Sequence, residues 1–140
     1  MADLKDLTLR FYKEVLENGN VAAVDDFVAV NAIEHEQPPP GVTREPGREG
    51  VKQLIKAYTD GFTSMSVQVH AQYRDGDTVI SRVTFGGTHT GTFGGIPATG
   101  KHISAEGIDI IRFEGERMAE HWGQFDAVGM LTQLGVMPPM

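Results

Sequence analysis

The first third of the chain has the hydrophobic spacing of an α-helix. Leu4, Leu7, Phe11 and Val15 recur at steps of three and four residues, so they share one side of a helix. The pattern stops at residues 18–20, Asn-Gly-Asn, a sequence typical of helix ends. The spacing therefore predicts an N-terminal helix with one apolar face.

Two more helices are predicted before the middle of the chain. Apolar positions between residues 21 and 28 mark a short helix, and those between 51 and 62 mark a longer one. Residues 36–50 lie between them and hold four prolines together with glycines. Because proline lacks a backbone donor and glycine adds backbone freedom, this segment is predicted to be a loop that follows His35.

The second half of the chain alternates apolar and polar residues, which is typical of strands. Val79, Ser81, Val83 and Phe85 are expected to face one way, and the residues between them the other. A short helix is expected at the end, stopped by Gly135. The predicted strands are residues 66–73, 78–89, 101–113 and 117–125, with turns at Asp75-Gly76, at residues 91–100 and at Gly115-Glu116.

This order of elements predicts an α+β fold in a single domain spanning residues 1–140. Helices that gather on one side of an antiparallel sheet form two layers around one core. We expect a cone-shaped barrel, in which a curved antiparallel sheet wraps around the N-terminal helices. Such a cone leaves room for an apolar cyclic or aromatic small molecule.

Composition narrows the classes of function. The formal net charge is −7, from 12 Lys and Arg against 19 Asp and Glu, so binding to nucleic acid is not expected. The chain has no cysteine, which excludes disulfides and thiolate chemistry. It starts without the apolar core of a signal peptide, and no apolar run approaches the roughly 20 residues of a membrane span. We therefore expect a cytoplasmic protein with no membrane partner.

The chain lacks the usual cofactor motifs. Gly100-Lys101 has no glycine at the upstream spacing of a phosphate-binding loop, and His35-Glu36 does not continue into the helical zinc motif. No serine lies in a nucleophile elbow. If the protein is an enzyme, we expect it to work without a cofactor or a metal.

Asp109 is the strongest candidate for acid–base chemistry. It lies in GIDIIRF, where its neighbours are mostly apolar. A carboxylate in such a strand is costly unless it is paired, hydrated or functional, and burial would raise its pKa towards neutrality. The alternative is a residue on the solvent face or edge of a half-buried strand.

The segment EHWGQFD adds possible pocket residues. Glu120, Trp122 and Gln124 share one face of a strand, and His121, Gly123 and Phe125 share the other. If residues 115 and 116 form a two-residue turn, Asp109 lies opposite Trp122 and near Glu120 and Gln124. That pairing predicts a polar cluster beside an aromatic wall.

Several other residues have two plausible roles. His35 could contact a ligand oxygen at the mouth of the pocket, or be an exposed loop histidine. His89 matches the phase of Val83 and Phe85 and could face inward, or it could hydrogen-bond a turn. Asp126 could be catalytic, but it also stands where an N-cap residue is expected. Tyr12 and Tyr58 could direct their hydroxyls into the pocket, or be core residues.

Four segments together resemble the SnoaL-like polyketide cyclases, often called ester cyclases. The matching strings are FYKEVLENGN, AIEHEQPPPG, GTHTG with GIPATGK, and GIDIIRFEGERMAEHWGQFDAVGMLTQLG, in order over about residues 8–135. The resemblance implies the cone-shaped α+β barrel of the nuclear transport factor two-like superfamily. It also implies a homodimer or larger homo-oligomer with one deep pocket in each chain.

The resemblance implies a cofactor-free reaction as well. Members of the family close a ring of a polyketide precursor by intramolecular aldol condensation, with a carboxylate as acid and base. His35 matches a family histidine before the proline loop, whereas a second family histidine falls at or near Asp109. Many relatives carry an aspartate, the expected acid/base, where this chain has Gly123.

Three functions therefore stay open. The first is a polyketide cyclase or isomerase acting on a cyclic carbonyl compound. The second is a non-catalytic protein that binds an apolar metabolite, and the third is an epoxide hydrolase-like enzyme that uses Asp109 and Asp126. The candidate catalytic residues are Asp109, Asp126, His35 and His89, and the candidate substrate-binding residues are Tyr12, Tyr58, Phe85, Glu120, Trp122, Gln124 and Phe125.

Overall fold

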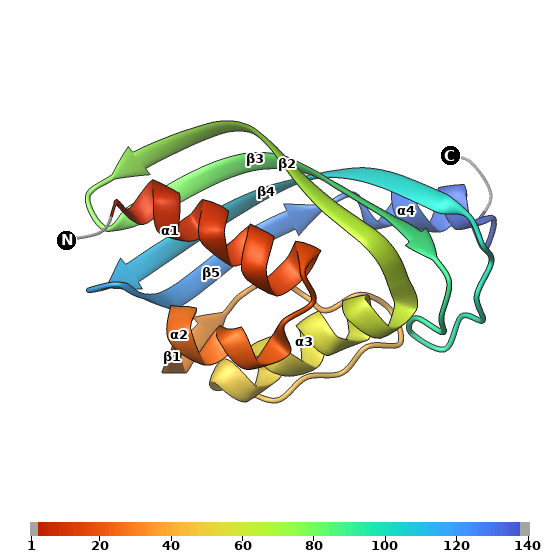
Figure 1. Ribbon diagram of the computed structural model, residues 1–140, viewed down its shortest axis with the longest axis horizontal. Coiled ribbons are helices and arrows are strands. Elements are labelled where there is room, and N and C mark those ends of the chain that lie inside the picture. The colour runs from red at the N-terminus through yellow and green to blue at the C-terminus, as the bar shows by residue number, and fades with distance from the viewer. Residues whose placement is uncertain (1–2, 138–140) are drawn as a thin grey trace.

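Helices cover one face of a strongly curved sheet in the computed structural model, which describes residues 3–137 (Figure 1). Five strands form the sheet in the order β1-β5-β4-β3-β2. Neighbouring strands are antiparallel except for β1 and β5, which are parallel. This architecture confirms the predicted α+β class. The strands are β1 Val28–Glu34, β2 Phe62–Asp75, β3 Thr78–His89, β4 His102–Glu114 and β5 Arg117–Phe125.

The predicted helices are present, with different bounds. The first begins as an α-helix and ends in wider turns, and the second is shorter than expected. The third begins at Gly47, so the proline-rich loop is shorter than predicted. The helical segments are α1 Leu4–Phe11, η1 Tyr12–Glu17, η2 Val21–Ala23, α2 Val24–Phe27, α3 Gly47–Gly61 and α4 Ala127–Leu134.

One strand was not predicted. Residues 28–34 form β1, whereas the sequence pattern was interpreted as helix running towards His35. The segment contains the β-branched residues Val28, Val30 and Ile33, which favour strands. Because β1 pairs with β5 from a distant part of the chain, only the tertiary structure shows its place.

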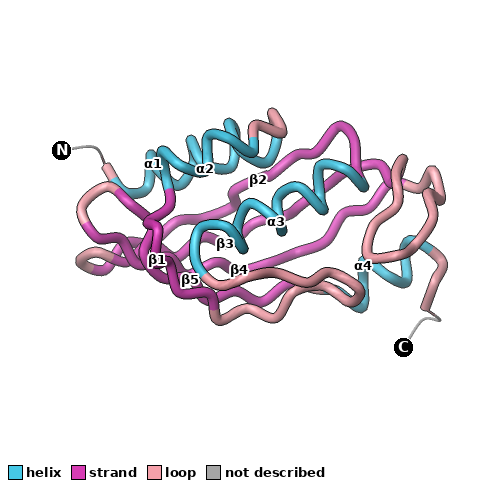
Figure 2. The backbone as a smooth tube through the Cα atoms, turned by 90° about the horizontal axis from the view of Figure 1, so that it is seen from below, coloured by secondary structure: helices cyan, strands magenta, loops and turns pink. Residues whose placement is uncertain are grey.

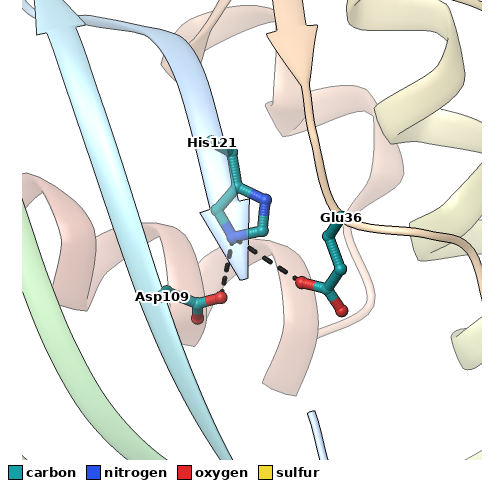
Figure 3. A group of neighbouring side chains, drawn as sticks. All are labelled: Glu36, Asp109 and His121. Atoms are coloured by element: carbon teal, nitrogen blue, oxygen red, sulfur yellow. Dashed lines mark hydrogen bonds and ion pairs between the residues drawn. The ribbon is translucent and has the colours of Figure 1, made fainter. Parts of the chain in front are cut away.

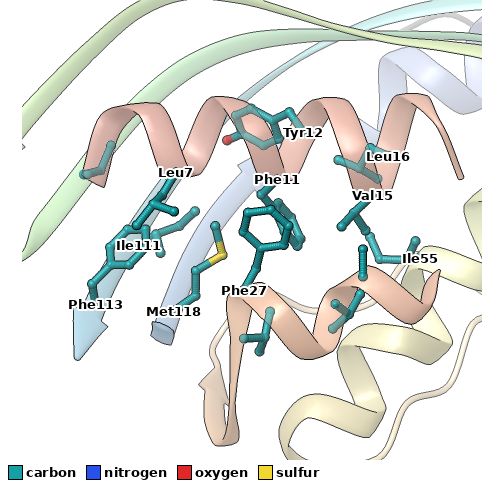
Figure 4. Close-up of a cluster of buried hydrophobic side chains, with 14 of the residues drawn as sticks. Leu7, Phe11, Tyr12, Val15, Leu16, Phe27, Ile55, Ile111, Phe113 and Met118 are labelled. Carbon is teal, nitrogen blue, oxygen red and sulfur yellow. The ribbon is translucent and has the colours of Figure 1, made fainter. Parts of the chain in front are cut away.

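The core lies between the helices and the concave face of the sheet. Figure 2 shows α1, α2 and α3 on the same side of the strands, and Figure 4 shows the side chains that they bury together. Phe11 packs edge-on against Phe27 with 5.7 Å between ring centroids. The core is completed by the inward residues of β3 and β4, such as Val79, Val83 and Ile111. No helix within residues 3–137 is long and apolar enough to cross a membrane.

Candidate active site

A cavity of about 150 Å³ opens between the helices and the sheet. Its walls are mainly apolar and aromatic, with polar side chains from β1, the segment after it, β4, β5 and two helical segments. Tyr12, Tyr58, Phe85 and Phe125, which the sequence offered as candidate substrate-binding residues, line it. The polar lining comprises Tyr12, Glu34, Glu36, Gln37, Tyr58, Asp109, Glu120, His121 and Gln124.

Asp109 faces this cavity, but with partners different from those predicted. It lies opposite Gly123, not Trp122. The turn at residues 115 and 116 has two residues as expected, yet β5 contains one extra residue, Ala119, between the partners of Arg112 and Phe113. Such a bulge shifts the register by one residue and exchanges the faces of the partner strand. His121 and Gly123 therefore share the face of Asp109.

The ring of His121 hydrogen-bonds to the carboxylates of Asp109 and Glu34, and Figure 3 shows its contacts with Asp109 and with the more distant Glu36. Its Nε2 lies 2.7 Å from Asp109 Oδ1, and its Nδ1 lies 2.7 and 2.8 Å from the oxygens of Glu34. Ionised carboxylates only accept hydrogen bonds, so both ring nitrogens must donate and the imidazole is a cation. Burial lowers the pKa of His121, but hydrogen bonds to Asp109 and Glu34 raise it more, to about 10.

Both oxygens of Asp109 are occupied. Oδ1 accepts from His121, and Oδ2 accepts from the hydroxyl of Tyr12 at 2.6 Å. Burial and the neighbouring Asp109 charge raise the pKa of Tyr12, so its hydroxyl keeps the proton that it donates. Asp109 therefore holds a cation and a phenol in place on the cavity wall.

Glu36 is the carboxylate that remains available. Within residues 3–137, no group donates a hydrogen bond to its side-chain oxygens, and its nearest charged partner is His121, with 3.9 Å between Oε1 and Nε2. The pKa of Glu36 is raised to about 7, mainly by burial; Asp109 and Glu34 also raise it, whereas His121 and Arg44 lower it. A group with this pKa can take and return a proton near neutral pH.

Gly123 leaves the space that Glu36 occupies. A Cβ atom on residue 123 would overlap Glu36 Oε1 and crowd the ring of His121. The glycine noted in the sequence is therefore matched by a carboxylate that enters the same volume from the segment after the neighbouring strand β1.

Tyr58 offers the free hydroxyl of the site. It lines the cavity from α3, and its hydroxyl has no hydrogen-bond partner in the described part of the chain. Burial and the charges of Glu36 and Asp109 raise the pKa of Tyr58 above its ordinary value. The hydroxyl therefore stays protonated and can donate to a ligand oxygen.

His35 and Trp122 lie on the other side of the strands. Their rings stack with centroids 4.8 Å apart, and Trp122 is 38% exposed. His35 Nε2 lies 2.6 Å from Glu120 Oε2, and Arg112 donates to the other oxygen of that carboxylate at 2.9 Å. His35 and Arg112 lower the pKa of Glu120. Glu120 and Gln124 reach the cavity lining, whereas His35 and Trp122 do not.

His89 and Asp126 have local partners. His89 is fully buried, and its Nδ1 accepts the backbone N–H of Thr99 at 3.2 Å in the glycine-rich turn. Asp126 is exposed and accepts the backbone N–H of Gly129 at 2.8 Å, which confirms its predicted position as the N-cap of α4. Neither residue lines the cavity.

The sequence did not identify Glu34, Glu36 or His121 as site residues. Glu34 lies at the end of the strand that was not predicted, and Glu36 lies in the segment after it. The predicted pairing of the last two strands contained no bulge, so it placed His121 on the face opposite to Asp109. The one available signal was Gly123, which indicated a missing side chain without showing what replaced it.

Glu36, Asp109 and His121 also form a cluster that could hold a metal ion. Their ligand atoms lie within 4.8 Å of one another. A cation there would have to replace the proton between His121 and Asp109. The arrangement as it stands is a half-buried, charged hydrogen-bond network beside one available carboxylate.

Comparison with known proteins places this cavity in a family. The model of the SnoaL-like polyketide cyclases matches residues 6–134. The aklanonic acid methyl ester cyclase DauD of Streptomyces sp. (strain C5) is 28% identical over 128 residues, covering 88% of this chain and 78% of DauD. DnrD of Streptomyces peucetius, which has the same described activity, is 26% identical over 127 residues, covering 88% of this chain and 87% of DnrD.

Solved structures agree with the sequence matches. TsrD from Streptomyces laurentii superposes with a TM-score of 0.85 and 26% identity, covering 98% of this chain and all of that one. IdmH from Streptomyces antibioticus superposes with a TM-score of 0.78 and 29% identity, covering 96% of this chain and 100% of the other. The fold, the cavity and the match over nearly the whole chain lead to one conclusion: the protein belongs to the SnoaL-like polyketide cyclase family.

Proposed function

We propose that the protein is a cofactor-independent acid–base enzyme that cyclises or isomerises an apolar cyclic or aromatic carbonyl compound, with Glu36 as the base. The observation that carries this proposal is the Glu36 carboxylate: it lines the cavity, lacks a hydrogen-bond donor within residues 3–137, and has its pKa raised to about 7. Asp109, the candidate from the sequence, is already engaged by Tyr12 and His121.

The reaction begins with proton transfer to Glu36. The carboxylate removes a proton from the carbon next to a substrate carbonyl, and the Tyr58 hydroxyl donates a hydrogen bond to the developing enolate oxygen. For a cyclase, that carbon then bonds to a second carbonyl carbon of the same molecule. The new alkoxide takes the proton back from Glu36, so the product is a hydroxy ketone with the atoms of the substrate. For an isomerase, the proton returns to a different carbon.

The groups around Glu36 set its pKa and exclude water from its carboxylate. The cation of His121 balances part of the charge of Glu34 and Asp109, which limits how far the pKa of Glu36 rises. The apolar walls exclude water, which strengthens the interactions of the remaining polar groups. We expect a homodimer or larger homo-oligomer, as the family resemblance implies, and a cytoplasmic location.

Hydrogen–deuterium exchange tests the proposal without the natural substrate. An uncharged bicyclic ketone, 2-tetralone, is incubated with the protein in deuterated buffer, and loss of its α-proton signals is followed by NMR. We expect the wild type to accelerate exchange and Glu36→Gln to lower the rate at least about 100-fold, the usual contribution of a general base. Glu106→Gln, an exposed carboxylate of β4, is the matched control and keeps the wild-type rate.

The outcomes separate the candidate functions. Equal exchange in Glu36→Gln and wild type would remove Glu36 from its role, and Asp109→Asn would then identify whether Asp109 is the base. Binding of the ketone without any accelerated exchange would favour the non-catalytic binding protein. The epoxide hydrolase-like alternative loses support because Asp126 caps α4 and does not line the cavity.

A further inference from the structure

Two arginine side chains hydrogen-bond to backbone carbonyls at the two ends of β1. Arg48 Nε donates to the carbonyl of Val28, the first residue of the strand, at 2.8 Å. Arg44 Nη2 donates to the carbonyl of Glu36, just beyond the strand, at 3.0 Å, and lies 3.5 Å from the carbonyl of Glu34. The two side chains thus make comparable contacts at opposite ends of one element.

The segment that carries Glu36 has few other attachments. The backbone N–H of His35 donates to the carbonyl of His121 at 2.9 Å, which is the last backbone bond to β5 in this direction. The N–H of Glu36 donates to Glu34 Oε1 at 2.8 Å. Residues 38–40 are prolines, which have no N–H to donate, so the chain leaves the sheet here.

Arg44 is enclosed next to this segment. Its side chain belongs to the groove between β1 and the proline-rich loop, and its Nε is buried without a hydrogen-bond partner among residues 3–137. Leaving a guanidinium nitrogen buried and unpaired is costly. Arg44 keeps this position although its Nε is unpaired, which indicates that the hydrogen bonds of its Nη2 offset the cost.

We propose that Arg44 is a positioning residue: by holding the carbonyl of Glu36, it keeps the Glu36 carboxylate inside the cavity, against Gly123. This inference rests on the proposed function, because it gives Arg44 a purpose through the base that the reaction uses. Arg44 itself does not line the cavity and touches no reacting atom.

The titration of Glu36 distinguishes positioning from a simple charge effect. The charged groups that face Glu36 are His121 from β5, Asp109 from β4, Glu34 from β1 and Arg44 from the loop, and burial is the largest cause of its raised pKa. Loss of the Arg44 charge alone would raise the pKa of Glu36 further. If instead the Glu36 carboxylate leaves its place in the cavity, it becomes exposed, and its pKa falls towards the ordinary range of a glutamate.

The experiment measures this pKa directly in the full chain. Protein labelled with ¹³C in glutamate side chains is titrated by NMR, and the Glu36 carboxyl signal is identified by its absence in Glu36→Gln. We expect Arg44→Ala to lower the midpoint of Glu36 from about 7 by at least about one unit, because burial, the main cause, is lost. Arg44→Lys keeps the charge and a donor, and should restore most of the wild-type midpoint. Arg48→Ala is the matched control and should leave it unchanged.

Each result decides the matter. A midpoint in Arg44→Ala that is unchanged or higher would overturn the positioning role and leave Glu36 as the base. If Arg44→Ala does not fold, Arg44→Met takes its place, because it removes the donors and keeps most of the side-chain volume. A midpoint at least about one unit below that of the wild type supports the positioning role, and an unchanged or higher midpoint overturns it. Failure of the proposed function would instead appear as wild-type ketone exchange in Glu36→Gln, whatever the titration shows.

Discussion

Glu36 and Gly123 share one small volume on the cavity wall. The carboxylate lies where a side chain on residue 123 would begin, so neither residue can be understood alone. The sequence identified the glycine as a departure from the aspartate expected by family resemblance. It could not identify the replacement, because Glu36 is 87 residues away in the chain and comes close only through the parallel pairing of β1 with β5.

Gly123→Ala tests this shared volume. The new methyl group would overlap Glu36 Oε1, so the carboxylate must move from its place. We expect ketone exchange to fall at least about tenfold, since a displacement of about 1 Å at a reacting group can cost 100-fold. Alanine suits a strand better than glycine, so the fold should be retained.

The complementary variant returns a carboxylate to residue 123. Glu36→Gly with Gly123→Asp should recover part of the exchange rate that Glu36→Gly alone loses. Wild-type exchange in Gly123→Ala, measured by the same NMR assay, would show that the position of Glu36 does not matter to the chemistry.

At the scale of elements, the sequence predicted local structure better than pairing. The strands 78–89 and 117–125 and the final helix were predicted from alternation and from Gly135, and the structure confirms them. The β1 strand was not predicted because it depends on pairing with the distant β5. The bulge at Ala119 lies within the β4–β5 hairpin, and the turn sequence does not show where an extra residue interrupts the pairing. One extra residue in β5 was enough to place Gly123, not Trp122, opposite Asp109 and to bring His121 onto the same face.

Asp126 shows how an element limits the roles of a residue. Its side chain accepts the N–H of Gly129 at the start of α4 and lies outside the cavity lining. We expect Asp126→Ala to lower the free energy of unfolding by about 1 kcal/mol, the usual effect of removing an N-cap, and to leave ketone exchange unchanged. Asp126→Ser should retain most of the stability. Chemical denaturation measures the first effect, and a large loss of exchange in folded Asp126→Ala would return Asp126 to the reaction.

At the scale of the whole molecule, the cavity places charged side chains next to an apolar core. Glu34, Asp109 and His121 form a network that the fold must hold together, while the aromatic walls on α1, α3 and β3 enclose it. The apolar pocket could be predicted from the sequence, since hydrophobic periodicity determines which faces are buried. The charge network could not, since it joins residues from three strands.

This network makes stability depend on pH. The folded protein raises the pKa of Glu36 from 4.5 to about 7 and that of His121 from 6.5 to about 10, so it holds protons that the unfolded chain has released. The stabilisation that comes from protonated Glu36 is fully present below pH 4.5 and is lost as the pH rises through about 7. The stabilisation that comes from protonated His121 is fully present below pH 6.5 and is lost as the pH rises through about 10.

We therefore expect the free energy of unfolding to fall by a few kcal/mol, as an order of magnitude, between pH 6 and pH 10. Urea denaturation over a pH series measures the fall. His121→Gln should flatten it above pH 7, whereas His35→Gln, which changes a histidine outside the cavity, should not. A stability that rises over this range would contradict the protonated state of His121.

The most direct test of the account is the pH dependence of exchange catalysed by the protein. Only the ionised form of Glu36 can accept a proton, so kcat/KM for exchange of 2-tetralone should rise tenfold per pH unit below the pKa of Glu36 and level off above about 7. Glu36→Gln should lose this inflection together with most of the rate. A rate that does not change between pH 5 and pH 9, or an inflection near 7 that persists in Glu36→Gln, would contradict the assignment of Glu36 as the base.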